Sequence, residues 1–213
     1  GMAATPETLA AAGIGRGMVR PDILASDAYQ RTREMTIDEL LLENRVVFLI
    51  GEINPGSAAR IMMQMLYLEH TKKNSNIDLY INSPGGAVDD TLAIYDTMRF
   101  LSSPVSTYCI GRAYSGAAVL LTAGAKGRRF ILPHAKVMMH QPFGGVMGQA
   151  EDIRLQAEQI IKAKNELIKI LARHTGQDEE RIRRDGERDK YFAAQEAKEY
   201  GLVDEVITEL PAA

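Results

Sequence analysis

The sequence predicts an α/β protein with a mainly parallel sheet. Three β-prone runs of strand length, 46–50, 77–81 and 105–110, alternate with segments that have helical periodicity. Strands that alternate with helices in this way form right-handed crossovers over a parallel sheet. Ligands on such sheets bind at the carboxyl ends of the strands, so we expect the functional site in the loops that follow these runs.

The first half of the chain is expected to contain two of these strands and three helices. A short helix over 36–42 leads to the strand 46–50, whose unbroken apolar run predicts burial on both faces. The strand 77–81 continues into a loop over 82–86 and a helix over about 88–101. The helix between the two strands covers about 55–70, and its periodicity predicts a core-facing stripe of Ala58, Ile61, Met62, Met65 and Leu66.

The second half begins with the strand 105–110 and a helix over 117–125. Two short β-like pieces follow at 130–132 and 136–139, then a helix over about 149–173 that stops at Gly176. That helix is longer and more amphipathic than one small domain readily covers, which predicts contact with another subunit; a purely internal contact is the alternative. Its apolar positions are Ile153, Ala157, Ile160, Ile161, Leu167, Ile168 and Leu171, and the tail adds helices near 179–184 and 194–200 and a strand over 202–207.

Length and composition narrow the functional classes. The 213 residues fit one domain, here 35–210, after a segment over 1–34 that lacks periodicity and is expected to be flexible. A net charge of −3 gives no electrostatic case for nucleic acid or an anionic membrane as a partner. No apolar run is long enough to span a bilayer, and the only cysteine, Cys109, is expected to be a buried thiol. Together these features favour a cytoplasmic protein.

Metal and nucleotide chemistry are not favoured. The histidines, His70, His134, His140 and His174, show neither a His-Glu-x-x-His pattern nor partners at ligand spacing, so neither a metal nor a cofactor is expected. The sequence lacks the Gly-x-x-x-x-Gly-Lys-Ser/Thr phosphate loop. Residues 124–129 resemble that loop superficially, but their order predicts a basic surface turn instead.

Ser115 is the first candidate for chemistry. The stretch 111–119 leads from the strand 105–110 into an apolar helix, so Ser115 lies at a strand-to-helix corner where its hydroxyl is exposed beside the first free amides of the helix. Serine is also a favoured helix N-cap, which is the ordinary alternative.

A nucleophilic serine needs a base and an acid that orients the base. His140 ends an apolar strand next to a glycine-rich segment, and catalytic groups favour loops held by rigid elements. A hydrogen-bonded structural histidine is the alternative. Asp189 could orient it, yet Asp185 and Glu187 are close in sequence, and spacing does not choose among the three.

Five motifs in order resemble the proteolytic subunit of the Clp protease, the ClpP family, over about 40–207. The resemblance implies a ClpP/crotonase-like fold with a protruding strand-helix handle at about 142–173. It also implies a serine endopeptidase in which Ser115 is the nucleophile, His140 the general base and Asp189 the residue that orients it, while the amides of Gly86 and Gly116 bind the oxyanion. The motifs are Asn82-Ser83-Pro84-Gly85-Gly86, the serine corner through Gly127, Met139-His140-Gln141-Pro142, His174-Thr175-Gly176-Gln177, and Glu187-Arg188-Asp189 with Glu199–Asp204.

The same resemblance implies an assembly. Members form stacked seven-membered rings around a closed chamber, in which Gly144-Gly145 and the long helix make the ring-to-ring handle and Arg188 makes an inter-ring ion pair. A separate AAA+ ATPase unfolds polypeptide substrates and threads them into the chamber. Residues 1–34 correspond to the axial-pore segment.

The serine corner departs from the family pattern. The family usually has a small residue followed by Ser, Met and Gly, where this chain has Tyr114, Ser115, Gly116 and Ala117. Gly116 is expected to loosen the corner and Tyr114 to add bulk beneath it, with altered or weak activity when the protein acts alone. Two rival functions remain: a structural or regulatory subunit of a mixed ring, and acyl-CoA chemistry on the related crotonase fold.

Overall fold

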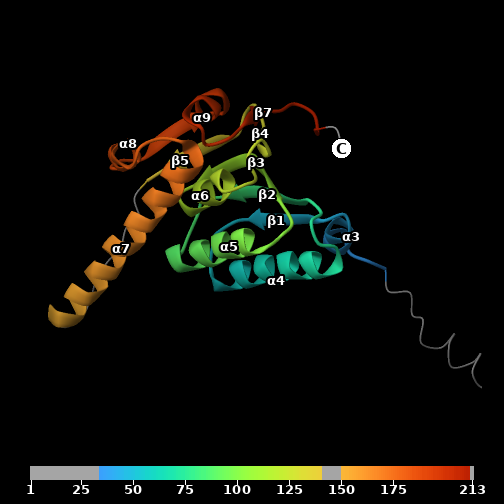
Figure 1. Ribbon diagram of the computed structural model, residues 1–213, viewed down its shortest axis with the longest axis horizontal. Coiled ribbons are helices and arrows are strands. Elements are labelled where there is room, and N and C mark those ends of the chain that lie inside the picture. Colours follow the sequence, from blue (N-terminus) through green and yellow to red (C-terminus); the bar gives the residue numbers. More distant parts are fainter. Residues whose placement is uncertain (1–33, 141–149, 212–213) are drawn as a thin grey trace, which may run out of the picture. The chain divides into compact units, whose positions relative to one another are not determined.

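Five parallel strands form the main path of the sheet, in the order β1-β2-β3-β4-β7 (Figure 1). The computed structural model describes residues 34–140 and 150–211, with backbone alone at 150 and 151, and the chain from Ile37 onward forms one compact unit. Two more strands extend the sheet, β5 in parallel beside β3 and β6 antiparallel beside β5. This confirms the mainly parallel α/β fold. The strands are β1 (Val46–Ile50), β2 (Ile77–Ser83), β3 (Val105–Tyr114), β4 (Arg129–Ile131), β5 (Lys136–Met139), β6 (Lys190–Ala193) and β7 (Glu205–Val206).

Helices flank this sheet, and α4 and α5 run side by side in Figure 1. The start of α4 is fixed by a capping box, in which Asn54 Oδ1 accepts from the Ser57 amide and Ser57 Oγ accepts from the Asn54 amide. The helices are α3 (Ile37–Glu43), α4 (Pro55–Thr71), α5 (Val88–Phe100), α6 (Gly116–Thr122), α7 (Ala150–Thr175), α8 (Glu179–Asp185) and α9 (Ala194–Tyr200).

The buried face of α4 differs in one position from the expected stripe. Ala58, Ile61 and Met65 are buried as predicted, Met62 is partly buried against the core, and Leu68 continues the line at helical spacing. Leu66 was expected in the core but is exposed, because it lies one residue beyond Met65 and therefore about 100° around the helix.

Two strands differ from the expectation: β1 is less buried, and the last strand is shorter. β1 is an edge strand, and its residues alternate between buried and more exposed positions, so burial on both faces was wrong. Successive side chains of a strand point to opposite faces of the sheet, so one face of β1 packs on the core while the other is more exposed. The last strand is confined to Glu205–Val206, although Leu202 and Val203 are buried in the loop before it.

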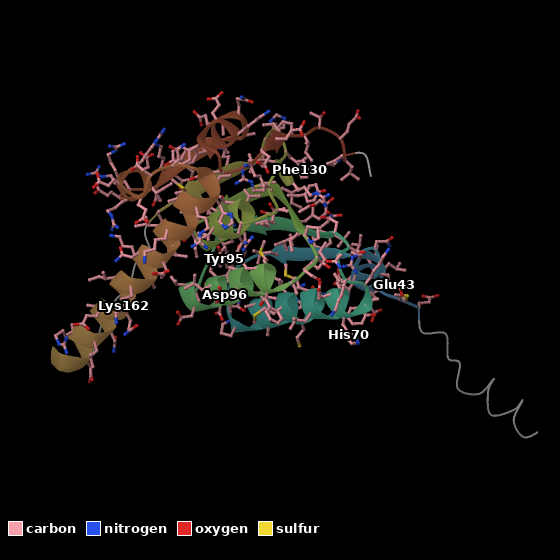
Figure 2. The ribbon with its side chains drawn as sticks, viewed as in Figure 1. Glu43, His70, Tyr95, Asp96, Phe130 and Lys162 are labelled. Atoms are coloured by element: carbon pink, nitrogen blue, oxygen red, sulfur yellow. The ribbon has the colours of Figure 1, made fainter. Side chains whose placement is uncertain are left out.

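One row of aromatic rings crosses the sheet and was not expected from the sequence. Paired positions on four neighbouring strands carry these rings, with centroids 5.5, 4.5 and 5.0 Å apart. Cross-strand aromatic pairs favour a single register, so the row helps to fix the strand alignment. Its members are Phe48, Tyr80, Tyr108 and Phe130, the last of which is labelled in Figure 2.

Gly111 lies inside β3 and not in the loop expected at the serine corner. β3 pairs with β4 through Thr107–Cys109 and with β5 through Arg112–Tyr114, so the strand changes its neighbour at Gly111. The register with β2 is irregular there, and Gly111 has φ +81°, a conformation that side chains disfavour. This bulge carries the end of β3, and with it Ser115, alongside β5.

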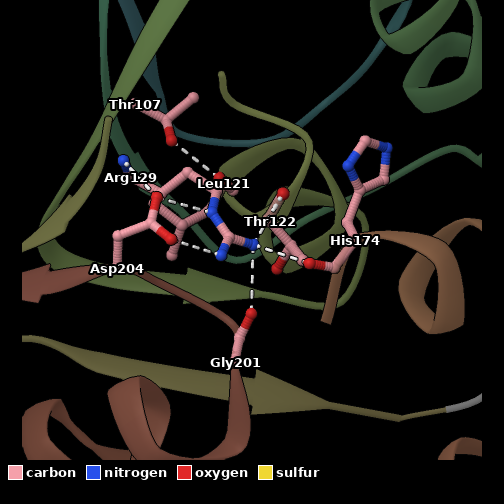
Figure 3. Close-up of polar contacts among 7 residues, drawn as sticks. All are labelled: Thr107, Leu121, Thr122, Arg129, His174, Gly201 and Asp204. Atoms are coloured by element: carbon pink, nitrogen blue, oxygen red, sulfur yellow. Dashed lines mark hydrogen bonds and ion pairs between the residues drawn. The ribbon is translucent and has the colours of Figure 1, made fainter. Parts of the chain in front are cut away.

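Arg129 is buried, which corrects the expectation that 124–129 forms a wholly exposed basic turn. Its Nε and Nη2 bind the two carboxylate oxygens of Asp204 at 2.9 and 2.6 Å (Figure 3). Its Nη1 donates to three carbonyls near the ends of α6, α7 and α9, those of Thr122, His174 and Gly201. Burial alone would raise the pKa of Asp204, but the hydrogen bonds and charge of Arg129 outweigh it and lower that pKa.

Cys109 is fully buried in β3, as predicted for a structural thiol. Removal from water disfavours the thiolate and raises the pKa of Cys109 to about 12. The thiol is therefore protonated and unreactive at neutral pH.

The free energy of unfolding is expected to depend on His174 in acid. His174 Nε2 lies 3.1 Å from the hydroxyl of Tyr95, a residue of α5 labelled in Figure 2. Burial, with the charges of Arg99, Arg129 and Arg173, lowers the pKa of His174 to about 4, against about 6.5 in the unfolded chain. The stabilisation is complete above pH 6.5 and is lost between pH 6.5 and 4. The change is about 2 kcal/mol once the full shift is reduced for the partial exposure of the ring to solvent.

Unfolding by denaturant at pH 4, 5, 6 and 7 measures this loss. His174→Gln should flatten the profile in this range, whereas His70→Gln, at an exposed position of α4, should leave it unchanged. An identical slope in the His174→Gln protein would contradict the assignment.

The two ends of α7 have different surroundings. Its later residues Leu167, Ile168, Ile170 and Leu171 are buried, and this part of the helix packs on α6 and α8. Ile153, Leu155 and Ile161 are 39%, 45% and 58% exposed. The predicted flexible segment, apart from Glu34, and the Gly144-Gly145 part of the handle lie outside the described residues.

Candidate active site

The backbone of Ser115 has a conformation that few serines adopt. Its φ is +55° and its ψ is −121°, between the end of β3 and the first turn of α6. The Ser115 amide donates to the Met138 carbonyl at 2.9 Å, which ties this corner to β5. Within the described structure its side chain makes no capping hydrogen bond to α6, so it does not act as a side-chain N-cap. Strain of this kind costs about 1–3 kcal/mol and is concentrated at functional sites.

His140 and Asp189 meet because β5 and β6 pair. The antiparallel register pairs Met139 with Lys190. His140, the residue after β5, and Asp189, the residue before β6, are therefore neighbours. His140 Nδ1 lies 3.3 Å from Asp189 Oδ1, with the side chains 22% and 51% exposed. An Nδ1–H group directed at this carboxylate leaves Nε2 as the acceptor nitrogen of the neutral ring.

The structure also distinguishes Asp189 from the two acidic alternatives. Asp185 accepts a hydrogen bond from the Tyr200 hydroxyl at 2.8 Å and pairs with Lys190 Nζ at 2.9 Å. Glu187 is exposed in the turn that precedes Asp189. Of the three, Asp189 is the one that faces His140 in the described contacts.

Ser115 and His140 line the same cavity, of about 430 Å³, together with Glu52 and the loop over 84–88. They also line a narrow second cavity of about 30 Å³. Its other walls include Val119 of α6, Met139 of β5 and Leu167, Ile168 and Leu171 of α7. The serine and the imidazole therefore face a wide cavity on one side and a narrow, mainly apolar recess on the other.

The glycine loop after β2 reaches the serine corner at close range. Gly85 has φ +87°, and a Cβ there would lie 2.8 Å from Ser115 Cβ and 3.1 Å from the Gly116 amide nitrogen. Its neighbour Gly86 forms a parallel bridge with Ile53, in which the Ile53 amide donates to the Gly85 carbonyl and the Ala87 amide donates to the Ile53 carbonyl. In a parallel bridge of this pattern the Gly86 amide points away from Ile53.

Gly116 is the first residue of α6, and its amide has no carbonyl one turn earlier in the helix to bind. The approach of Gly85 places the loop that carries Gly86 against this amide. The two candidate oxyanion donors therefore belong to segments that meet beside Ser115, although they are 30 residues apart in the sequence.

Comparison with known proteins identifies the family. The model of the Clp protease family matches residues 29–210. The chain belongs to the Clp protease family. A curated relative from Rhodopirellula baltica, called ATP-dependent Clp protease proteolytic subunit 1, is 55% identical over 185 residues, which cover 87% of this chain and 82% of the relative.

Within the Clp protease family, Tyr114 is one of the departures noted at the serine corner. Its ring contacts Tyr191 edge-on at 5.6 Å, and the Arg112 guanidinium lies 5.6 Å from its centroid. The described walls of the two cavities at Ser115 do not include Tyr114. Its bulk is directed toward β6.

A second departure in this Clp protease family chain, Gly116, is buried against α5. A Cβ at Gly116 would lie 2.4 Å from Thr91 Oγ1, so the side chain of Thr91 occupies the adjacent space. Gly116 therefore packs directly against the Thr91 side chain.

Sequence reasoning missed three contacts at this candidate site. Gly85 could have been found from the Pro-Gly signal, which marks a turn that often needs positive φ. Thr91 and the Met138 carbonyl have no sequence signal, since their role comes from contacts across the fold.

Arg188, expected at an inter-ring contact, is exposed next to Asp189.

The described side chains contain no group of three or more His, Cys, Asp or Glu residues that could hold a metal ion. Across 34–140 and 150–211, no helix has the length and apolar character needed to cross a bilayer.

Proposed function

We propose that this chain is a serine endopeptidase in which Ser115 is the nucleophile, His140 the general base and Asp189 the residue that orients the base. The observation that carries the proposal is the contact between His140 Nδ1 and Asp189 Oδ1 on the wall of the cavity that also contains Ser115. The positive φ of Ser115 supports it, because nucleophilic serines are often presented on strained strand-to-helix turns.

The reaction follows from these positions. Ser115 Oγ attacks a peptide carbonyl while its proton passes to His140 Nε2, and Asp189 stabilises the imidazolium. The oxyanion of the tetrahedral intermediate accepts hydrogen bonds from the amides of Gly86 and Gly116. The C–N bond then breaks as His140 returns the proton to the leaving amine. Water, activated by His140, hydrolyses the acyl-serine and restores the enzyme.

The narrow cavity between α6 and α7 is the proposed pocket for a substrate side chain. Its walls are mainly the apolar side chains of Val119, Met139, Leu167 and Leu171. Desolvation of an apolar group there is favourable, so an apolar residue next to the scissile bond is the expected preference.

The substrates are proposed to be unfolded polypeptides, delivered into a chamber of stacked heptameric rings by a separate AAA+ ATPase. The name of the relative, an ATP-dependent proteolytic subunit, supports this division of labour. Exposed apolar residues on α7, Ile153, Leu155 and Ile161, supply surface that a second subunit could cover, and exposed Arg188 could form the inter-ring ion pair. The chamber is proposed to be cytoplasmic and to contain no metal or cofactor.

A regulatory ring subunit with little activity is the second candidate. The observation that favours it is the altered serine corner, with Tyr114 and Gly116 in place of the usual small residue and methionine. In this case the chain would supply interfaces to a mixed ring, and a second ClpP-type subunit would supply the turnover.

A fluorophosphonate probe distinguishes the two candidates. The assembled protein, its ring mass verified by native mass spectrometry, should be modified at Ser115, because only an activated serine attacks the probe. Ser115→Ala should remain unmodified, and Ser83→Ala, at a buried serine whose Oγ accepts from the Gly85 amide, controls for damage to the loop. Absence of labelling in the correctly assembled protein, alone and with a second ClpP-type subunit, would reject the peptidase proposal.

A further inference from the structure

Thr91 is a buried polar residue that the catalytic proposal does not use. It lies in the first turn of α5 and is 0% exposed. Its Oγ1 donates to the Ala87 carbonyl at 2.9 Å, alongside the Thr91 amide, which donates to the same carbonyl at 3.0 Å. The side chain is therefore fixed to the residue that directly follows Gly86.

The other side of Thr91 contacts the serine corner. A Cβ built on Gly116 would lie 2.4 Å from Thr91 Oγ1, 3.2 Å from Cγ2 and 3.3 Å from Cβ. Gly116 does not have the positive φ that would require glycine, so the crowding comes from Thr91 and not from the backbone conformation. Glycine at 116 and threonine at 91 therefore fit as a pair.

The pair lies between the two segments that carry the proposed oxyanion donors. Ala87 connects Thr91 to Gly86 on one side, and Gly116 rests on the Thr91 side chain on the other. The family usually has methionine after the nucleophile, and a methionine side chain at 116 would meet Thr91. In this chain Thr91 of α5 contacts both segments.

We propose that Thr91 is a positioning residue for peptide hydrolysis, whose side chain sets the place of the Gly116 amide relative to Gly86. This inference rests on the proposed function. If Thr91 has this role, the loss of the methionine does not by itself make the corner inactive, because the Thr91 side chain packs against the corner from α5.

Steady-state hydrolysis of a fluorogenic peptide by the assembled protein tests the role of Thr91. Thr91→Ala should lower kcat about tenfold or more with little change in KM, since a displaced donor weakens transition-state binding more than ground-state binding. Thr91→Ser keeps the hydroxyl and should retain most of the activity. Thr97→Ala is the matched control, because Thr97 of α5 makes the same type of bond, to the Ala93 carbonyl at 2.8 Å, away from the site.

A double-mutant comparison tests the contact itself. Gly116→Ala should lower kcat by about 10²-fold, the usual effect of losing one oxyanion donor. Adding Thr91→Ala removes Oγ1 and Cγ2 from the new methyl group and should restore at least part of that loss. The melting temperature, measured in parallel, should show the same partial rescue.

The outcomes separate the two proposals. If the wild-type protein is active but Thr91→Ala changes only the melting temperature and not kcat, Thr91 is structural and the positioning role is overturned. Losses in kcat that simply add in the double mutant would also overturn it. If the wild-type protein neither hydrolyses peptides nor reacts with the probe, the proposed function fails, and the positioning role fails with it.

Discussion

Peptide hydrolysis should fall by about 10²–10⁴-fold when Asp189 is replaced by asparagine. An asparagine amide can present its NH₂ group to His140 Nδ1, which favours the tautomer with the proton on Nε2. That tautomer cannot accept the Ser115 proton. The loss is expected below the upper end of the range because the Asp189 side chain is 51% exposed, so water can partly replace its carboxylate.

The comparison with Glu187→Gln makes this test specific. Glu187 is an exposed acidic residue two positions earlier, and removing its charge should leave kcat unchanged. Both variants should assemble as the wild type does and keep its melting temperature, because neither side chain is buried. Equal losses in the two variants would show that general electrostatics, and not orientation of His140, explains the effect.

The second large effect concerns stability. Arg129→Met should lower the free energy of unfolding by about 3–5 kcal/mol, the range for breaking one side of a buried ion pair. The substitution leaves the Asp204 carboxylate without its cation and removes the donor shared by the Thr122, His174 and Gly201 carbonyls (Figure 3). A cation near three helix ends also complements their partial negative charges, which adds to the loss.

Thermal and urea unfolding measure this change, and a fall in melting temperature of about 6–20 °C corresponds to it for a chain of this size. Arg129→Lys keeps the charge but not the planar guanidinium group, so its free energy of unfolding should lie between those of the wild type and Arg129→Met. Lys126→Met, at an exposed neighbouring position, should stay within about 0.5 kcal/mol of the wild type. A stability of Arg129→Met equal to that of Lys126→Met would contradict the role of the buried network.

The candidate site could be predicted only in part. The sequence pattern located Ser115 at a strand-to-helix corner, because the change from a β-rich run to an apolar helical run is local. It left Asp185, Glu187 and Asp189 open, since spacing does not show which carboxylate faces His140. The register between β5 and β6 decided the matter by placing the residue before Lys190 next to the residue after Met139.

Local sequence signals also failed to predict burial where burial depends on tertiary contacts. Arg129 lies in a basic, glycine-containing turn that predicts exposure, yet β4 carries it under three helix ends. Leu66 and Leu68 have the same hydrophobicity, and only the contact of α4 with the core determines which of them is buried.

The order of strands and helices, the parallel sheet and the glycine loops at its carboxyl edge follow from the amino-acid order, because periodicity and turn residues act over a few positions. The pairing of His140 with Asp189, the change of neighbour in β3 at Gly111 and the packing of Thr91 against Gly116 were decided by the tertiary structure. They join residues 25 or more positions apart or depend on strand register, and a single sequence carries no local signal for distances of that kind.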